Sequence, residues 1–251
     1  MADQRRTALI TGSGQNIGRA IAIALAADGF NIVVNGLTKR VPCEDTAEAA
    51  RAIGAAHGVE AIVAMGDVGT AEGCAEIAGT GISRFGAIDV LVHNAAIRPS
   101  APFLEMDEAE WRRVIDVNLN GAFWLARLCL PGMLKAGWGR VITFGGVNAM
   151  HGYNGRAHVS VSKHGNWGLA KALAKEFGSR GITANMVSPG AIRSEHDDPA
   201  MTAHIKAHES SIPVGRLGEP DEIAATVSLL ASDKGGYING QMIQVNGGLQ
   251  T

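Results

Sequence analysis

Residues 11–18 combine glycines with the order of elements that a phosphate-binding turn requires. The segment reads TGSGQNIG and follows an apolar run at 7–11. From Ile17 to Leu25 the apolar residues recur at helical spacing. Glycines let a backbone approach a pyrophosphate closely, and the N-terminus of a helix offers free N–H groups to it. Because strand, glycines and helix come in this order, the turn predicts a dinucleotide site rather than an ordinary glycine-rich turn.

The end of the second apolar run bears on the choice of dinucleotide. In NAD sites an acidic residue here normally holds the ribose 2′-hydroxyl. After residues 31–35 no acid stands before Glu44, whereas Lys39 and Arg40 do follow. A carboxylate would repel a 2′-phosphate, and a cation could pair with one. These residues favour NADP over NAD.

The segment 194–198, Ser-Glu-His-Asp-Asp, contains residue types that bind metals. The alternative is a polar, solvated loop, and we favour it. We therefore expect no metal site.

The elements that must position these residues follow from the apolar runs. Such runs occur at 7–11, 31–35, 61–65, 88–92, 141–144, 183–187 and 242–245, and helical segments such as 47–56 separate them. Runs without polar alternation indicate parallel strands buried on both faces. No linker, composition break or repeat divides the chain. We expect one doubly wound α/β domain over residues 1–251, with a mainly parallel sheet and helices on both faces.

Composition narrows the function classes. The 251 residues are 46% hydrophobic and 18% charged, which suits a large core and excludes a disordered chain. The net charge is −2 and the basic residues are scattered, so no nucleic-acid surface is indicated. No apolar run approaches the roughly 20 residues of a membrane helix, and none suits a signal peptide. Cys43, Cys74 and Cys129 match no disulfide or metal spacing. We expect a cytoplasmic protein with a small-molecule substrate.

Further blocks, in order along almost the whole chain, resemble the short-chain dehydrogenase/reductase (SDR) family. They are GDV at 66–68, HNAA at 93–96, VNLNG at 117–121, SPGAI at 188–192, GRLGEP at 215–220 and a C-terminal stretch over 238–248. The family's first motif is TGxxxGxG, and here Asn16 replaces the middle glycine. Asparagine tolerates a left-handed backbone better than other non-glycine residues, so we expect the turn to survive. The resemblance implies a Rossmann-type fold and an NAD(P)-dependent oxidoreductase.

The resemblance also implies which residues bind the cofactor. Asp67 corresponds to the family's adenine-binding Asp, Lys163 to the Lys on the nicotinamide ribose, and 188–192 to the loop beside the nicotinamide. The family's usual NADP arginines would fall at Gln15 and Leu37, where no charge stands. The expected cofactor residues are Gly12, Ser13, Gln15, Asn16, Ile17, Gly18, Asn35, Asp67, Val68, Asn94, Ala95, Ala96, Lys163, Pro189, Gly190 and Ile192.

The chain departs from the family at the catalytic residues. The family uses Ser, Tyr and Lys, with Tyr four residues before Lys on one helix face. Lys163 is present, but Val159 stands at the Tyr position and Gly146 at the Ser position. The family's active-site Asn corresponds to Asn118. We therefore expect a non-standard active site, in which an apolar floor suits an imine or activated alkene better than a plain ketone.

Another group must then donate the proton, unless the protein has lost hydride chemistry. Asn148, His151, Tyr153 and His158 lie in the segment that borders the substrate pocket in the family, and a His can exchange a proton near neutral pH. We rank His151 first, then His158, which reaches the pocket only if its helix begins after it, and Tyr153 third. Two alternatives remain open. One is a non-catalytic dinucleotide-binding oligomer, and the other is a lyase or dehalogenase-like enzyme, which we rank last because the cofactor motifs persist.

The resemblance finally implies an assembly and a lid. The family usually forms homotetramers through the helices that carry Asn118 and Lys163 and through the C-terminal strand. The apolar segments 122–124 and 167–169 lie on those helices. The substrate lid is expected at about 191–214, which makes the acidic segment part of it.

Overall fold

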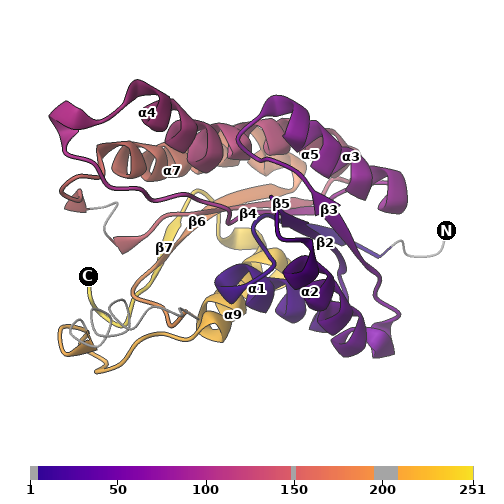
Figure 1. Ribbon diagram of the computed structural model, residues 1–251. Coiled ribbons are helices and arrows are strands. Elements are labelled where there is room, and N and C mark those ends of the chain that lie inside the picture. Colours follow the sequence, from indigo (N-terminus) through magenta and orange to yellow (C-terminus); the bar gives the residue numbers. More distant parts are fainter. Residues whose placement is uncertain (1–4, 148–150, 195–208, 251) are drawn as a thin grey trace.

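Seven parallel strands form the centre of the molecule in the computed structural model, which describes residues 5–147, 151–194 and 209–250 (Figure 1). Within these residues the order across the sheet is β3-β2-β1-β4-β5-β6-β7, and every pairing is parallel. The strands are β1 (Thr7–Ile10), β2 (Asn31–Gly36), β3 (Ala61–Met65), β4 (Val90–His93), β5 (Gly139–Phe144), β6 (Ile182–Pro189) and β7 (Met242–Val245). The expected doubly wound α/β fold is confirmed.

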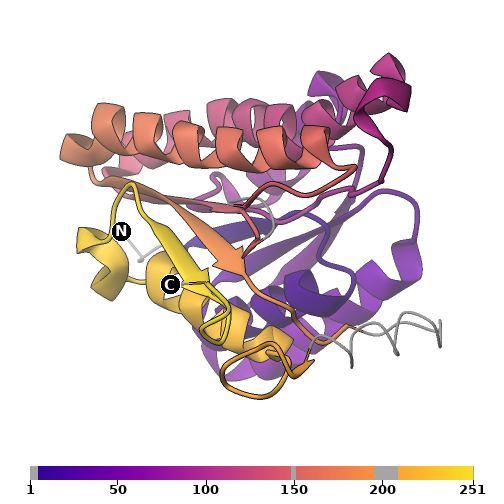
Figure 2. The same cartoon turned by 90° about the vertical axis from the view of Figure 1, so that its left-hand side faces the viewer.

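Helices cover both faces of the sheet (Figures 1 and 2). On one face lie α1 (Asn16–Ala27), α2 (Arg40–Ile53) and α9 (Pro220–Ala231), whose apolar side chains pack on the sheet in one buried cluster. On the other lie α3 (Ala71–Phe85), α4 (Glu108–Ile115), α5 (Gly121–Ala136) and α7 (Ala157–Phe177), over a second cluster. This two-sided cover is why the strands β1, β2, β4, β5 and β6 are buried and read as continuous apolar runs.

Short turns complete the described elements. Residues 116–120 form a π-helical turn that joins α4 to α5, and 3₁₀ turns lie at Ala55–His57, Phe103–Glu105, Gly178–Arg180 and Asp233–Tyr237. The helix expected at 47–56 instead runs from Arg40 to Ile53. Proline at position 42 is tolerated because it lies in the first turn, where its missing N–H costs no helical hydrogen bond.

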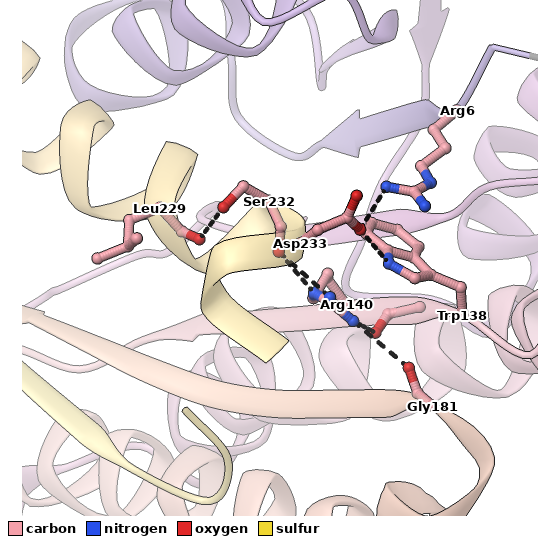
Figure 3. Close-up of polar contacts among 8 residues, drawn as sticks. Arg6, Trp138, Arg140, Gly181, Leu229, Ser232 and Asp233 are labelled. Carbon is pink, nitrogen blue, oxygen red and sulfur yellow. Dashed lines mark hydrogen bonds and ion pairs between the residues drawn. The ribbon is translucent and has the colours of Figure 1, made fainter. Parts of the chain in front are cut away.

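The amino ends of β1, β5 and β6 are tied together by a cluster around Trp138 (Figure 3). The guanidinium groups of Arg6 and Arg140 lie 3.7 and 4.1 Å from the centre of a Trp138 ring. Asp233 accepts hydrogen bonds from Arg6 Nη1 at 2.9 Å and from Trp138 Nε1 at 2.8 Å. Buried Arg140 donates to the carbonyl oxygens of Gly139 and Ser232. These contacts stabilise the amino ends of three strands.

The carboxyl edge carries the topological switch point. β1 lies between β2 and β4, so the chain runs outward in opposite directions from this place in the sheet. In open α/β sheets ligands bind in the crevice that forms here. No helix in the described part of the chain is long and apolar enough to cross a membrane.

Candidate functional site

A cavity of about 510 Å³ lies at this switch point. It extends from the turn after β1 to the carboxyl end of β6 and to Lys163 on α7. The lining includes Gly12, Gln15, Asn16, Ile17, Gly18, Asn35, Asp67, Val68, Asn94, Ala95, Ala96, Lys163, Pro189, Gly190 and Ile192. Fifteen of the sixteen residues expected from the sequence at the cofactor site therefore line one cavity.

The turn after β1 has the backbone that the sequence predicted. Asn16 has φ 50°, and among the described residues it is the one non-glycine with positive φ. Gly12 has φ +61°, and a Cβ added to it would lie 3.0 Å from Ala95 Cα. A Cβ on Gly18 would collide with the Gly12 carbonyl oxygen. The turn thus needs Gly12 and Gly18 for its own packing, and Asn16 replaces the middle glycine of the motif at the cost of a left-handed backbone.

Thr11 and Asn94 hold this turn against the end of β4. Asn94 Nδ2 donates to the carbonyl oxygens of Thr11 and Gly12 at 3.0 and 3.1 Å. Thr11 Oγ1 accepts from the backbone N–H groups of Asn94 and Ala95, both at 3.0 Å. Buried Thr11 is a positioning residue that sequence reasoning missed. Its place directly before the glycines was the available signal.

Ser13 is the one expected cofactor residue that does not line the cavity. Its Oγ donates to the Ile10 carbonyl oxygen at 2.8 Å and accepts from the Asn35 N–H at 3.0 Å. Its own N–H donates to the Asn35 carbonyl oxygen at 2.9 Å. Ser13 is fully buried, and its hydrogen-bonding groups join the turn to β2. The expectation that it contacts the cofactor is corrected: it supports the turn from behind.

Asp67 forms an ion pair that the sequence did not indicate. Arg113 on α4 contacts both carboxylate oxygens at 3.0 Å, and the Gly69 N–H donates to Oδ1 at 2.8 Å. Although partial burial opposes it, these hydrogen bonds hold the pKa of Asp67 below its usual value. Asp67 is therefore a fixed anionic acceptor on the cavity wall, and Arg113 lines the wall beside it.

Lys163 lies at the end of the cavity formed by the residues after β5. Its side chain is buried, and Nζ donates to the Phe144 carbonyl oxygen at 2.9 Å. Burial, and then the positive charge of Arg98, lower the pKa of Lys163 to about 7. An amine with this pKa can gain or lose a proton near neutral pH.

The residues at the family's Ser and Tyr positions offer no hydroxyl here. Gly146 lines the cavity with φ +152°, and a Cβ added to it would meet no atom within 4 Å. Val159 is buried in the first turn of α7 and does not line the cavity. A serine at 146 would therefore have room, but it would need a backbone conformation that L-residues rarely adopt.

Asn118 acts within the scaffold rather than on the cavity surface. It is fully buried on the π-helical turn, where its Oδ1 accepts from the Ile97 N–H at 2.9 Å. Its Nδ2 donates to the Ile97 carbonyl oxygen and to Ser162 Oγ, and its own carbonyl oxygen accepts from Asn166 Nδ2. Asn118 thus positions the segment after β4 against α7. The sequence placed Asn118 in the active site, and in the structure it positions other segments of the site without lining the cavity.

His158 does not reach the cavity. The helix begins at Ala157, so the condition under which His158 could face the pocket is not met. The ring is fully buried, stacks on Trp111, and lies with Nε2 3.3 Å from Glu110 Oε1. Its Nδ1 accepts the Val159 N–H, which places the ring proton on Nε2. The prediction of His158 as a proton donor is corrected: it joins α7 to α4.

His151 and Tyr153 are exposed and do not line the cavity. The Arg156 guanidinium lies over the Tyr153 ring, 4.8 Å from its centre, so the two side chains form a cation–π contact. Asn148, the acidic residues 195–198 and much of the expected lid lie outside the described residues, although Ser194 and Arg193 line the cavity. Within the described parts, no three His, Cys, Asp or Glu side chains come together in a metal-binding arrangement.

Arg98 lines the cavity and was missed by sequence reasoning. It stands shortly after the carboxyl end of β4, at the edge where ligands bind in this fold. That position was the available signal. Buried His93, the last residue of β4, was missed as well, and burial followed by the charge of Lys163 lowers its pKa to about 4. His93 is therefore neutral at physiological pH, and it does not line the cavity.

The end of β2 contributes no acid to the lining. Leu37, 56% exposed, lines the cavity here together with Asn35. Asn35 Nδ2 donates to the Ala64 carbonyl oxygen at 3.0 Å, so this amide links β2 to β3. Exposed Lys39 and Arg40 lie just beyond, and Arg40 is 3.6 Å from Glu44. Among the described lining residues Asp67 is the only acid.

Comparison with known proteins shows which proteins the chain resembles. A family model described as Enoyl-(Acyl carrier protein) reductase matches residues 12–250. The chain is 39% identical over 245 residues to 3-oxoacyl-[acyl-carrier-protein] reductase FabG of Staphylococcus aureus, with 97% of this chain and 98% of that protein covered. It is 37% identical over 245 residues to Nodulation protein G of Azospirillum brasilense, with 98% of each covered. Among solved structures it is similar to acetoin dehydrogenase YohF of Salmonella typhimurium, with TM-score 0.88, 32% identity, and coverage of 98% and 96% of the two chains.

Proposed function

Because the chain belongs to the short-chain dehydrogenase/reductase family, we propose that it is an NAD(P)-dependent oxidoreductase whose active site works without the family's Ser and Tyr. The observation that carries the proposal is the single cavity, which joins the glycine turn at residues 12–18 to Lys163. When bound there, the nicotinamide exchanges a hydride with a substrate carbon. The proposed substrates are small carbonyl or alcohol compounds, imines or activated alkenes.

The residues present fit a dinucleotide. Gly12 carries no side chain, and a Cβ added to it would lie 3.0 Å from Ala95 Cα. The backbone of the turn is therefore open to a ligand at this position. The N-terminus of α1 follows directly, and its positive dipole end would attract phosphate oxygens. Lys163 is proposed to bind the nicotinamide ribose, and Asp67 is proposed to bind the adenine of the cofactor.

We propose NADP as the preferred cofactor. No acid of the described lining stands at the end of β2, where a carboxylate would select NAD. Lys39 is exposed nearby, and the part of the chain that the structure describes offers it no ion-pair partner. A 2′-phosphate would be attracted to such a cation.

Lys163 is the proposed proton donor. It is buried in the cavity wall, its pKa is about 7, and the neighbouring Gly146 provides no competing hydroxyl. In reduction, hydride transfer to the substrate carbon leaves negative charge on the carbonyl oxygen, on the imine nitrogen or, in an activated alkene, on the carbon next to the activating group. The Lys163 ammonium would donate its proton to that atom, and the neutral amine would then take a proton from solvent. His151 remains the rival candidate from the sequence.

Two measurements test this function. Calorimetry should show NADP binding with a Kd below about 1 mM, and tighter than that of NAD. Absorbance at the reduced-nicotinamide band, across panels of ketones, imines, enones and alcohols, should then reveal turnover. Absence of binding by either dinucleotide would overturn the proposal.

The pH profile separates the two proton donors. With Lys163 as donor, reduction should fall as pH rises through about 7, because the ammonium is lost. Lys163→Gln should remove that limb, whereas His151→Ala should keep it. If the fall in rate disappears in His151→Ala and persists in Lys163→Gln, His151 is the proton donor instead.

A non-catalytic dinucleotide-binding oligomer is the second candidate. The missing hydroxyls favour it, because the family's proton-transfer residues are the ones replaced. It predicts tight dinucleotide binding without turnover on any panel.

A further inference from the structure

Part of the positive charge that lines the cavity has no carboxylate partner among the described residues. Its charged lining residues are Asp67, Arg98, Arg113, Lys163 and Arg193. Arg113 pairs with Asp67 at 3.0 Å, and Arg193 pairs with Glu219 at 2.9 Å. Arg98 and Lys163 have no carboxylate within ion-pair distance among residues 5–147, 151–194 and 209–250. Two unpaired cations thus face one space.

A third cation, Arg156, lies near Arg98 but does not line the cavity. The segments that carry Arg98 and Arg156 are joined where the Ala101 N–H donates to the Gly155 carbonyl oxygen at 2.9 Å. Arg156 is half-buried, and its Nε is enclosed with no hydrogen-bond partner. After burial, the charge of Arg156 is what lowers the pKa of Arg98, so the two guanidinium groups lie within electrostatic reach.

Such an arrangement costs free energy unless an anion binds. Like charges repel, and a polar group that is buried without a partner is unfavourable. A guanidinium presents a planar fork of donors that matches the two oxygens of a carboxylate.

We infer that Arg98 binds a carboxylate of the substrate, with Arg156 beside it. The inference rests on the proposed function and adds a substrate class to it: oxo acids, imino acids or unsaturated acids with a free carboxylate. The carboxylate anchors the molecule on the segment after β4. Arg98 lies close enough to Lys163 for their charges to interact, so the anchored substrate has its reactive group next to the proposed proton donor.

A phosphate group of the cofactor is the other source of an anion for Arg98. The position of Arg98 argues against it, because the residue follows Ile97, which Asn118 holds against α7 near Lys163. The phosphate-binding turn follows β1 and contacts Asn94 and Ala95, which precede Ile97 and Arg98 in the segment after β4. The experiment below separates the two sources.

Matched acids and amides provide the test. The protein saturated with NADP is titrated with benzoate and 4-oxopentanoate and, separately, with benzamide and 4-oxopentanamide. We expect the acids to bind, and the amides to bind at least about 10-fold more weakly. Arg98→Gln should weaken the acids by about 10- to 100-fold and leave the Kd of NADP unchanged. Arg98→Lys should restore part of the loss.

Arg112→Gln is the control, because Arg112 is exposed on α4 and pairs with Glu108. It removes the same charge without touching the cavity, so binding of the acids should not change. Equal binding of acids and amides by the wild type would overturn the inference, as would a loss of NADP affinity in Arg98→Gln. Inorganic phosphate that displaces the acids at lower concentration than acetate would assign the site to a phosphate instead. Failure of NADP itself to bind would refute the proposed function. In that case the acid titration, repeated without cofactor on the wild type and on Arg98→Gln, would still test whether Arg98 binds a carboxylate.

Discussion

The hydrogen bond of 2.9 Å from Lys163 Nζ to the Phe144 carbonyl oxygen joins helix α7 to the last residue of β5. It places a buried amine directly before Gly145 and Gly146, where the family's Ser would stand. Burial, and then the positive charge of Arg98, lower the pKa of Lys163 to about 7, and the neutral carbonyl acceptor supplies no compensating charge. Burial of the charged form of this lysine therefore costs stability, and we propose that it serves the chemistry of the site.

Replacing either glycine of the turn should abolish dinucleotide binding. In Gly12→Val the side chain would strain a backbone at φ +61° and meet Ala95, and in Gly18→Val it would collide with the Gly12 carbonyl oxygen. We expect the Kd of NADP in calorimetry to rise by at least about 100-fold. Gly79→Ala is the matched control, since a Cβ there meets no atom within 4 Å. Wild-type affinity in both valine variants would rule out this turn as the phosphate site.

Lys163→Met should stabilise the protein while it removes turnover. The folded-state pKa of Lys163 is about 7 against an ordinary 10.5. Between these values the unfolded chain holds a proton that the native state has lost, so stability rises with pH through this window and is lowest below it. We expect a gain of about 1–3 kcal/mol at pH 6, since the lost hydrogen bond offsets part of the relieved cost.

Urea titrations at pH 6 and pH 10 measure this gain, which should largely vanish at the higher pH. The exposed Lys175 on the same helix provides the control variant, Lys175→Met, which should show no such pH dependence. A destabilised Lys163→Met at pH 6 would contradict a costly buried charge.

Restoring the family's hydroxyls should not produce an ordinary ketone reductase. Serine at 146 would have to adopt φ near +152°. Tyrosine at 159 would replace a smaller side chain that is buried, with only 9% of its surface exposed. We expect Gly146→Ser/Val159→Tyr to strain the backbone at 146 and overpack the core at 159, to lose the native turnover and to be less stable by about 1–3 kcal/mol. Thermal unfolding and reduction of a simple ketone panel check this. Fast ketone reduction by the double variant would mean that the chain is a degraded standard member of the family.

Assembly through α5 and α7 is the fourth prediction, and the expected form is a homotetramer. Phe123 on α5 and Val161 on α7 are 42% and 49% exposed, whereas Ala122 is buried in the core and cannot contribute to an interface. Phe123→Glu/Val161→Glu should dissociate the assembly in sedimentation velocity. Leu104→Glu, at a residue 96% exposed outside these helices, should leave it intact. A wild type that sediments only as a monomer at micromolar concentration would exclude the tetramer.

The sequence determined the fold class and most of the residues that line the cavity because both depend on local patterns. Apolar runs without alternation predict buried parallel strands, whereas the order of these strands across the sheet, and with it the switch point, came only from the structure. The left-handed Asn16 could be expected because the motif requires a positive φ there and asparagine tolerates it. Ser13 was misassigned because a motif does not reveal which way each side chain of a turn points.

Only the tertiary structure decided which charged and titratable groups share the cavity. Asp67 and Arg113 are 46 residues apart in the chain and pair across α4 and the end of β3. His158 looked available, but packing of α4 on α7 encloses it, whereas Arg98 and Lys163 come from separate elements and face the same cavity. Spacing along one helix or strand fixes directions only within that element. Contacts between elements depend on how side chains fill the space between them, and burial and neighbouring charge, which set the pKa of Lys163, arise from that packing.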